Sequence, residues 1–110
     1  MKILVVEPSK LPMVKEIDGS LESMQKIVGG YIEAIYPFDD PIALVCNEEG
    51  KINGLPPNRV LVDKDGNVLD IICGTFFLCA APPDSDEFKG LSDEQIKRYA
   101  EKFRNVVVML

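Results

Sequence analysis

The residues best suited to binding chemistry lie in one polar, proline-stiffened segment, Asn53-Gly54-Leu55-Pro56-Pro57-Asn58-Arg59. Arg59 carries a planar guanidinium that can bind a phosphate or a carboxylate through two parallel hydrogen bonds. Asn53 and Asn58 each offer a donor and an acceptor, which recognition of a base edge or a ribose requires. The two prolines lower the entropy lost when such a loop becomes ordered. We interpret this segment as a loop that recognises a small anionic, nucleotide-like ligand.

Three residues elsewhere in the chain complete this candidate ligand-binding site. Gly74 and Thr75 lie at a break between two apolar runs, and we expect them beside the Asn/Arg loop. Tyr31 adds an aromatic ring from an earlier strand. Tyr31 and Tyr36 fall on opposite faces of that strand, so at most one of the two rings meets the ligand.

A purely structural interpretation of the same segment is the alternative. Arg59 could pair with a nearby acid, Asp63 or Glu48, and the asparagines could simply close turns. The two interpretations differ in one respect, which is whether the guanidinium and its amide neighbours face a shared hollow or tie down their own turns.

An acidic group offers a second kind of chemistry. Asp39, Asp40 or Glu33 could hold a divalent cation in a small metal-dependent hydrolase or transferase. Two neighbouring aspartates without further ligands bind a cation weakly, however. Aspartate is also a preferred turn residue, so a solvated turn is the simpler interpretation.

Composition excludes several classes of function. The chain has no histidine, so it holds no Ser-His-Asp or Cys-His nucleophile system and no two-histidine metal motif. We therefore assign no catalytic residue, no metal and no cofactor. The 110 residues carry 18 acidic and 12 basic side chains, a formal net charge of -6. This charge argues against nonspecific binding to nucleic acid or to an anionic membrane, which requires a basic surface.

Cysteine usage indicates a reducing compartment. The three cysteines lie in apolar stretches, and their odd number and spacing fit neither a C-x-x-C pair nor a zinc knuckle. We expect buried thiols, which places the protein in the cytoplasm. No apolar run approaches the length of a membrane span, and the first residues do not form a secretory signal.

The elements that must position these residues follow from hydrophobic patterning in one domain, residues 1–110. Strands are expected at 2–7, 13–17, 31–36, 42–46, 60–62, 68–73 and 75–81. A helix begins after Ser20, a good N-cap, and ends at Gly29-Gly30. A second helix begins with the capping box of Ser92 and Gln95. This order predicts an α+β fold, a curved and mostly antiparallel sheet with two helices packed on it.

The chain ends in an apolar, uncharged segment, 106–110. Left exposed, such a segment promotes aggregation. We expect it either to add a strand to the sheet or to pair with another copy of the chain. In the second case Val106, Val107 and Val108 would form a homo-oligomer interface.

Several short segments together resemble a known family. They are Gly30-Tyr31-Ile32-Glu33, Pro37-Phe38-Asp39-Asp40, Cys46-Asn47-Glu48-Glu49-Gly50-Lys51, Gly54-Leu55-Pro56-Pro57-Asn58-Arg59 and Ile72-Cys73-Gly74-Thr75-Phe76-Phe77. With these segments the chain resembles the domain of unknown function thirty-eight forty-six, found in Firmicutes, their mobile elements and their phages. The resemblance implies a small cytosolic accessory protein of a mobile element and supplies no catalytic residues. The apolar tail after Phe103 departs from the family.

Taken together, the sequence predicts a non-enzymatic binding module that acts against or alongside host systems. Its target is either a host protein or a small anionic nucleotide-like ligand. Two alternatives remain open: the metal-dependent hydrolase or transferase, and a structural subunit that associates with itself through the apolar tail.

Overall fold

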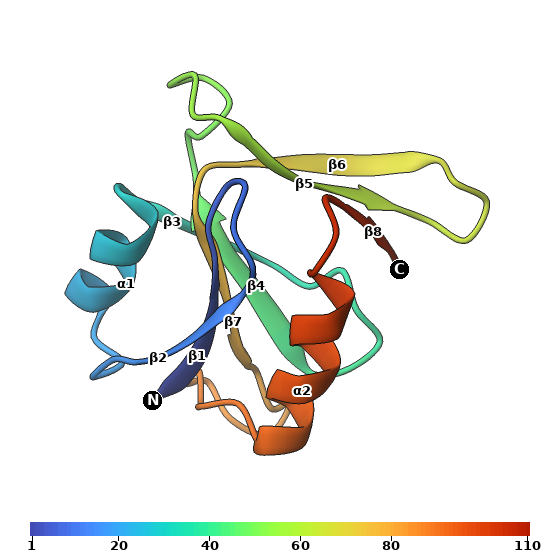
Figure 1. The fold of residues 1–110 in the computed structure, drawn as a ribbon. Coiled ribbons are helices and arrows are strands. Elements are labelled where there is room, and N and C mark those ends of the chain that lie inside the picture. Colours follow the sequence, from blue (N-terminus) through green and yellow to red (C-terminus); the bar gives the residue numbers. More distant parts are fainter.

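The computed structural model describes residues 1–110 and contains eight strands and two helices (Figure 1). In chain order they are β1 (Lys2–Val6), β2 (Met13–Glu16), α1 (Leu21–Val28), β3 (Ile32–Ile35), β4 (Ile42–Asn47), β5 (Pro57–Val62), β6 (Val68–Cys73), β7 (Phe76–Ala80), α2 (Asp93–Lys102) and β8 (Val107–Met109). The α+β class with two helices is confirmed.

The strands form two sheets. The large sheet has the order β2-β1-β7-β4-β3, and all of its neighbouring strands are antiparallel. The small sheet has the order β6-β5-β8, in which β6 is antiparallel and β8 parallel to β5. The single sheet that the sequence suggested is thus divided. The division falls at Gly74, whose φ of +85° turns the chain sharply between β6 and β7.

The central strands of the large sheet, β1, β7 and β4, are buried on both faces, which explains their continuous apolar runs. On one face, Met24 and Val28 of α1 pack against residues of the sheet such as Val5, Val45 and Phe77. Together they belong to a core of eight buried residues. On the other face lie α2 and the small sheet (Figure 1). This second core holds 14 buried residues and takes side chains from both sheets and from α2.

Both helices begin at the capping residues that the sequence predicted. The Ser20 side chain accepts a hydrogen bond from the Ser23 backbone N–H at the start of α1, and Gly29 ends the helix with φ +77°. The capping box of Ser92 and Gln95 starts α2. Both helices are much shorter than the roughly 20 residues that span a bilayer, and neither is a candidate membrane span.

The start of β5 is the main error in the predicted elements. The polar segment was interpreted as a loop up to Arg59, whereas β5 already begins at Pro57. Proline is tolerated there because the first residue of a strand need not donate to the ladder. Asn58 and Arg59 are therefore strand residues, and their side chains are fixed by the sheet.

The apolar tail forms a strand within its own chain, as one of the two expectations stated. Residues Val60, Leu61 and Val62 of β5 are in register with β8. Within β8 the side chains alternate, so that Val108 is buried in the shared core while its two neighbours are exposed.

Candidate functional site

Arg59 and Asn58, the centre of the predicted ligand site, are buried in the protein. Each has only 2% of its surface exposed. They lie at the start of β5, where the register with β6 shifts between Pro57 and Arg59. Such a bulge lets consecutive side chains leave the usual alternation of strand faces. Two neighbouring polar residues are thus both enclosed.

The guanidinium of Arg59 is bonded entirely to oxygens of its own chain. Nε donates to the Phe103 carbonyl oxygen at 3.0 Å. One terminal nitrogen donates to the Asn58 carbonyl oxygen at 3.1 Å and to Asn58 Oδ1 at 2.7 Å. The other donates to the Lys10 carbonyl oxygen at 2.8 Å. Burial lowers the pKa of Arg59 from its usual value, and no carboxylate pairs with it.

The Asn58 amide extends this network to the large sheet. Its Nδ2 donates to the Val6 carbonyl oxygen at 2.8 Å and to the Gly74 carbonyl oxygen at 2.9 Å. Val6 ends β1, and Gly74 lies between β6 and β7. Together, Asn58 and Arg59 connect the small sheet to the large sheet and to the end of α2.

The expectation that these side chains face a shared hollow is therefore not met in the structure. The alternative ion pair is not formed either, since Arg59 contacts neither Asp63 nor Glu48. Asp63 instead accepts hydrogen bonds from the backbone N–H groups of Asp65 and Asn67 at the tip of the β5–β6 hairpin.

The other predicted site residues are dispersed. Asn53 is exposed in the turn before β5, and Thr75 is half-buried. Tyr31 is 70% exposed beside β3. Gly74 contributes only its carbonyl oxygen to the network, and a side chain there would collide with Leu55. None of the predicted ligand-binding residues lines any of five cavities on the protein surface.

The acidic residues considered for metal chemistry are also separated. Asp39 and Asp40 line a cavity of about 740 Å³ beside α2, whereas Glu33 lines a different one. Asp40 Oδ2 accepts hydrogen bonds from the Tyr99 hydroxyl at 2.6 Å and from Arg98 at 2.7 Å. These bonds, with that from Tyr99 foremost, lower the pKa of Asp40.

The same contact stabilises the neutral form of the phenol. Burial, followed by the hydrogen bond to Asp40, raises the pKa of Tyr99. Tyr99 also packs edge-to-face on Phe38, with 4.9 Å between ring centroids. Asp40 thus fastens the β3–β4 turn to α2. No group of three or more acidic or cysteine side chains in the chain is arranged to hold a metal ion.

The most unusual surface is the side of the small sheet that faces away from the large sheet, which we call the outer face. Ile71, Val60 and Val107 are paired in one row across its three strands. Leu69 and Met109 lie two residues further along β6 and β8, on the same side by strand alternation. Four of these five side chains are exposed, from 39% at Ile71 to 61% at Met109.

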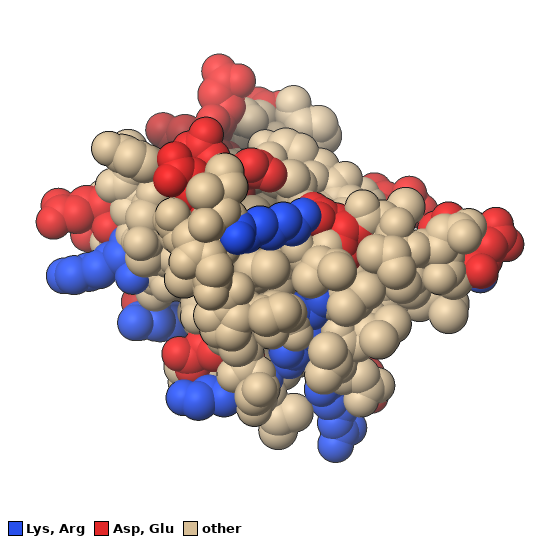
Figure 2. Space-filling view, turned by 90° about the horizontal axis from the view of Figure 1, so that it is seen from above, with Lys and Arg blue, Asp and Glu red and all other residues tan.

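The outer face has no charged side chain in its central row, and no helix covers it. Figure 2 views the molecule from above and shows a broad uncharged area, with acidic side chains at its upper and right-hand margins and basic side chains across its upper part and at its left and lower margins. Contiguous exposed apolar surface on a small protein marks an interaction site more often than scattered apolar residues do. The outer face is our candidate functional site.

The sequence pattern alone indicates part of the apolar outer face. The tail 106–110 was identified as apolar surface that needs a partner, but Leu69 and Ile71 were not singled out. Their strand reads as a nearly continuous apolar run, which is typical of burial on both faces. Only the division into two sheets reveals that one face of β6 has no covering layer.

The architecture defines an α+β domain in which an antiparallel sheet and a smaller mixed sheet are joined by a buried arginine and asparagine. Residues 1–104 match the family described as a domain of unknown function, DUF3846. The chain therefore belongs to the DUF3846 family, as the resemblance indicated. Neither a curated protein nor a solved structure matches it.

Proposed function

We propose that this protein is a non-enzymatic binding module that docks a partner protein on the outer face of its small sheet. The observation that supports the proposal most strongly is the row of Ile71, Val60 and Val107, extended by Leu69 and Met109. An uncovered sheet face of β-branched and long apolar side chains gains free energy when another surface removes it from water.

The charge of the chain favours a partner of opposite sign. The formal net charge is -6, although both acidic and basic side chains lie around the uncharged area (Figure 2). A partner with an apolar centre and a net positive charge would be attracted over long range and would associate faster at low salt. A second copy would bring the same negative charge to the interface, so self-association is the less favoured version.

A small anionic ligand at Arg59 is also less favoured. The donors of that guanidinium already bond to carbonyl oxygens and to Asn58, so a ligand would have to displace contacts that connect the two sheets. The metal-dependent alternative loses support as well, because Glu33 does not share a cavity with Asp39 and Asp40.

The cellular setting is part of the same proposal. All three cysteines are free thiols, which suits a reducing cytoplasm. An accessory protein of a mobile element in Firmicutes or their phages, as the resemblance implied, would meet its partner among host proteins there.

A matched pair of double variants tests the proposal. Ile71→Lys with Val107→Lys places two cations on the outer face, whereas Val14→Lys with Leu21→Lys places two cations on exposed apolar positions elsewhere. The immobilised wild-type protein and the control are expected to retain the same protein from a host lysate. The outer-face variant is expected to lose it.

Once that partner is purified, calorimetry measures its Kd for the wild-type protein and for each double variant. The outer-face variant should bind at least about 100-fold more weakly, because its two lysine ammonium groups would lose their water at the centre of the interface without gaining a partner charge. The proposal is wrong if the wild-type protein retains nothing, or if both double variants bind with the wild-type Kd.

A further inference from the structure

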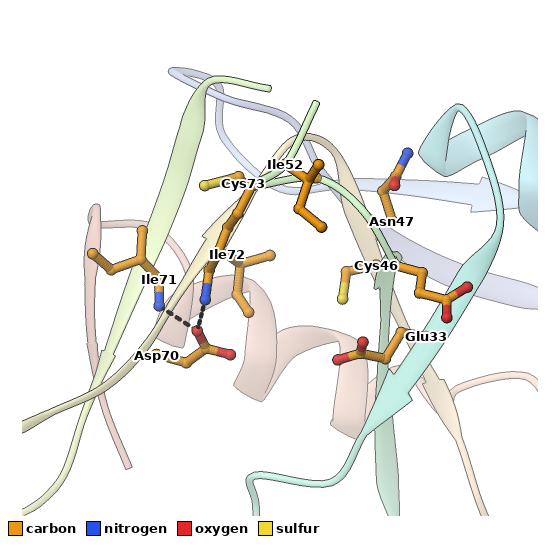
Figure 3. A pocket seen from close by; sticks show the side chains of 11 residues that line it. Glu33, Cys46, Asn47, Ile52, Asp70, Ile71, Ile72 and Cys73 are labelled. Atoms are coloured by element: carbon orange, nitrogen blue, oxygen red, sulfur yellow. Dashed lines mark hydrogen bonds and ion pairs between the residues drawn. The ribbon is translucent and has the colours of Figure 1, made fainter. Parts of the chain in front are cut away.

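A second site lies between the two sheets, at the free edge of β6. It is a cavity of about 210 Å³, bounded by β6 on one side and by β3, β4 and the 48–52 turn on the other. Figure 3 shows the side chains of Cys46, Ile52 and Ile72 around it. Most of its wall is apolar, and its mouth carries charged groups. The cavity borders the outer face, because Ile71 belongs to both, but its other lining residues lie outside that face.

Close backbone packing holds the 48–52 turn against the end of β6. A side chain at Gly50 would come within 2.6 Å of the Cys73 carbonyl oxygen, so the turn lies directly against β6. The Ile52 side chain is 85% exposed at the tip of the turn. An isoleucine held so far into solvent beside an apolar hollow offers contact area for a second molecule.

The charges at the mouth are unbalanced. Asp70 Oδ1 accepts hydrogen bonds from Lys51 Nζ and from the Ile71 backbone N–H. Glu33 and Glu48 have no hydrogen-bond or ion-pair partner for their carboxylates. Figure 3 shows Glu33 on the side of the opening that faces Asp70. One lysine thus stands against three acidic side chains, and that lysine is already paired.

The negative charges at the mouth also affect the Cys46 thiol on the inner wall of the cavity. The Cys46 thiol is buried, and burial raises its pKa to about 11, with further contributions from the negative charges of Glu33 and Asp70. The positive charge of Lys51 acts in the opposite direction and does not cancel them. Acidic groups at the mouth therefore act on atoms inside the cavity.

We propose that this cavity binds a primary ammonium group carried on a short aliphatic chain. The apolar wall contacts the methylene groups, while the carboxylates of Glu33 and Glu48 at the mouth bind the cation. The volume is below the range of drug-sized pockets, which fits a slender chain and excludes a nucleotide. An anion would face the unpaired carboxylates and is excluded by charge.

The same chemistry has two sources, a free diamine or the lysine side chain of a protein. Putrescine represents the first source, and lysine with blocked backbone termini represents the second. Butan-1-ol serves as the uncharged probe of comparable length. The two sites share Ile71, but the test of this cavity uses different probes and leaves every outer-face residue unchanged, so binding here and docking there can fail separately.

The experiment is a titration of the full 15N-labelled chain with each probe, followed by NMR. Saturable shifts are expected for the backbone amides of Glu33, Ile52 and Ile72 with putrescine, and none with butan-1-ol. A response to the blocked lysine as well assigns the site to lysine side chains, whereas a response to putrescine alone assigns it to free diamines.

Two isosteric variants complete the test. Glu33→Gln keeps the shape of an exposed side chain and is expected to weaken putrescine binding by about threefold, the size of one partly exposed charge interaction. Glu22→Gln on α1 removes the same charge elsewhere and should leave binding unchanged. The proposal is overturned if neither cation gives saturable shifts at tens of millimolar, if butan-1-ol shifts the same amides, or if both variants behave alike.

Discussion

At the scale of single residues, the unusual feature is a buried guanidinium without a carboxylate. A buried charge is costly unless hydrogen bonds replace the water it loses. Arg59 meets this demand with three backbone carbonyl oxygens and the side-chain oxygen of Asn58. Its fork of five donors suits several acceptors at once, which a lysine ammonium cannot match.

The first prediction follows from this geometry. Arg59→Lys keeps the charge but leaves several of these oxygens without a donor, and it is expected to lower the free energy of unfolding by about 2–4 kcal/mol. Urea denaturation measures the loss. The control is Arg104→Lys, an exposed residue paired with Glu101 at 3.5 Å, for which a change within about 0.5 kcal/mol is expected. Equal effects of the two variants would contradict a structural role for Arg59.

For the same residues, the sequence indicates the unusual residue types but not the orientation of the side chains. The residue types Asn58 and Arg59 were correctly recognised as unusual in an apolar chain. Their orientation depends on a register shift in β5 and on carbonyl groups from Lys10 and Phe103, which are about 44 to 49 positions away in the chain. No local pattern encodes contacts of that separation.

At the scale of elements, the helices were the most predictable part. Their signals are local: Ser20 and Gly29 bound α1, and Ser92 with Gln95 starts α2. The large sheet was anticipated strand by strand, because its apolar runs are long and separated by clear turns. The start of β5 was not predicted, because polar residues such as Asn58 and Arg59 are typical of a loop in sequence although they face inward in the structure. The division into two sheets was not predicted either.

The second prediction concerns the cap of α1 and its dependence on pH. Asp18 Oδ1 accepts hydrogen bonds from the Ser23 hydroxyl at 2.6 Å and from the Ser20 backbone N–H at 2.8 Å. These bonds, with that from Ser23 foremost, lower the pKa of Asp18 from 3.8 to about 2. A lowered folded-state pKa means that the carboxylate stabilises the fold above pH 3.8 and loses that effect as the pH falls towards 2.

Asp18→Asn removes this linkage. Urea midpoints of wild type and variant are expected to differ above the unfolded-state pKa and to converge as the pH approaches 2. Asp84→Asn is the control, because the Asp84 side chain makes no hydrogen bond, and its curve should run parallel to that of the wild type. A constant difference between Asp18→Asn and the wild type at every pH would show that the cap acts without its charge.

At the scale of the whole molecule, the two sheets share one core. Leu61, Ile72 and Val108 of the small sheet pack in the same cluster as Leu44 and Phe76 of the large sheet. The buried Arg59 network adds polar connections between the same parts. We therefore expect the small sheet to unfold together with the large one, although its outer face is uncovered.

Two variants of neighbouring residues in β8 test this cooperativity. Val108 is 1% exposed in the shared core, whereas Val107 is 56% exposed on the outer face. Val108→Ala should lower the free energy of unfolding by about 1–3 kcal/mol, because it removes buried methyl groups and leaves a cavity. Native-state hydrogen exchange should report the same decrease for the slowest amides of β5 and of β7, since both exchange through global unfolding. Val107→Ala should change neither strand appreciably. A decrease confined to β5 after Val108→Ala would instead show that the small sheet opens alone, and the outer face would then belong to a separately mobile unit.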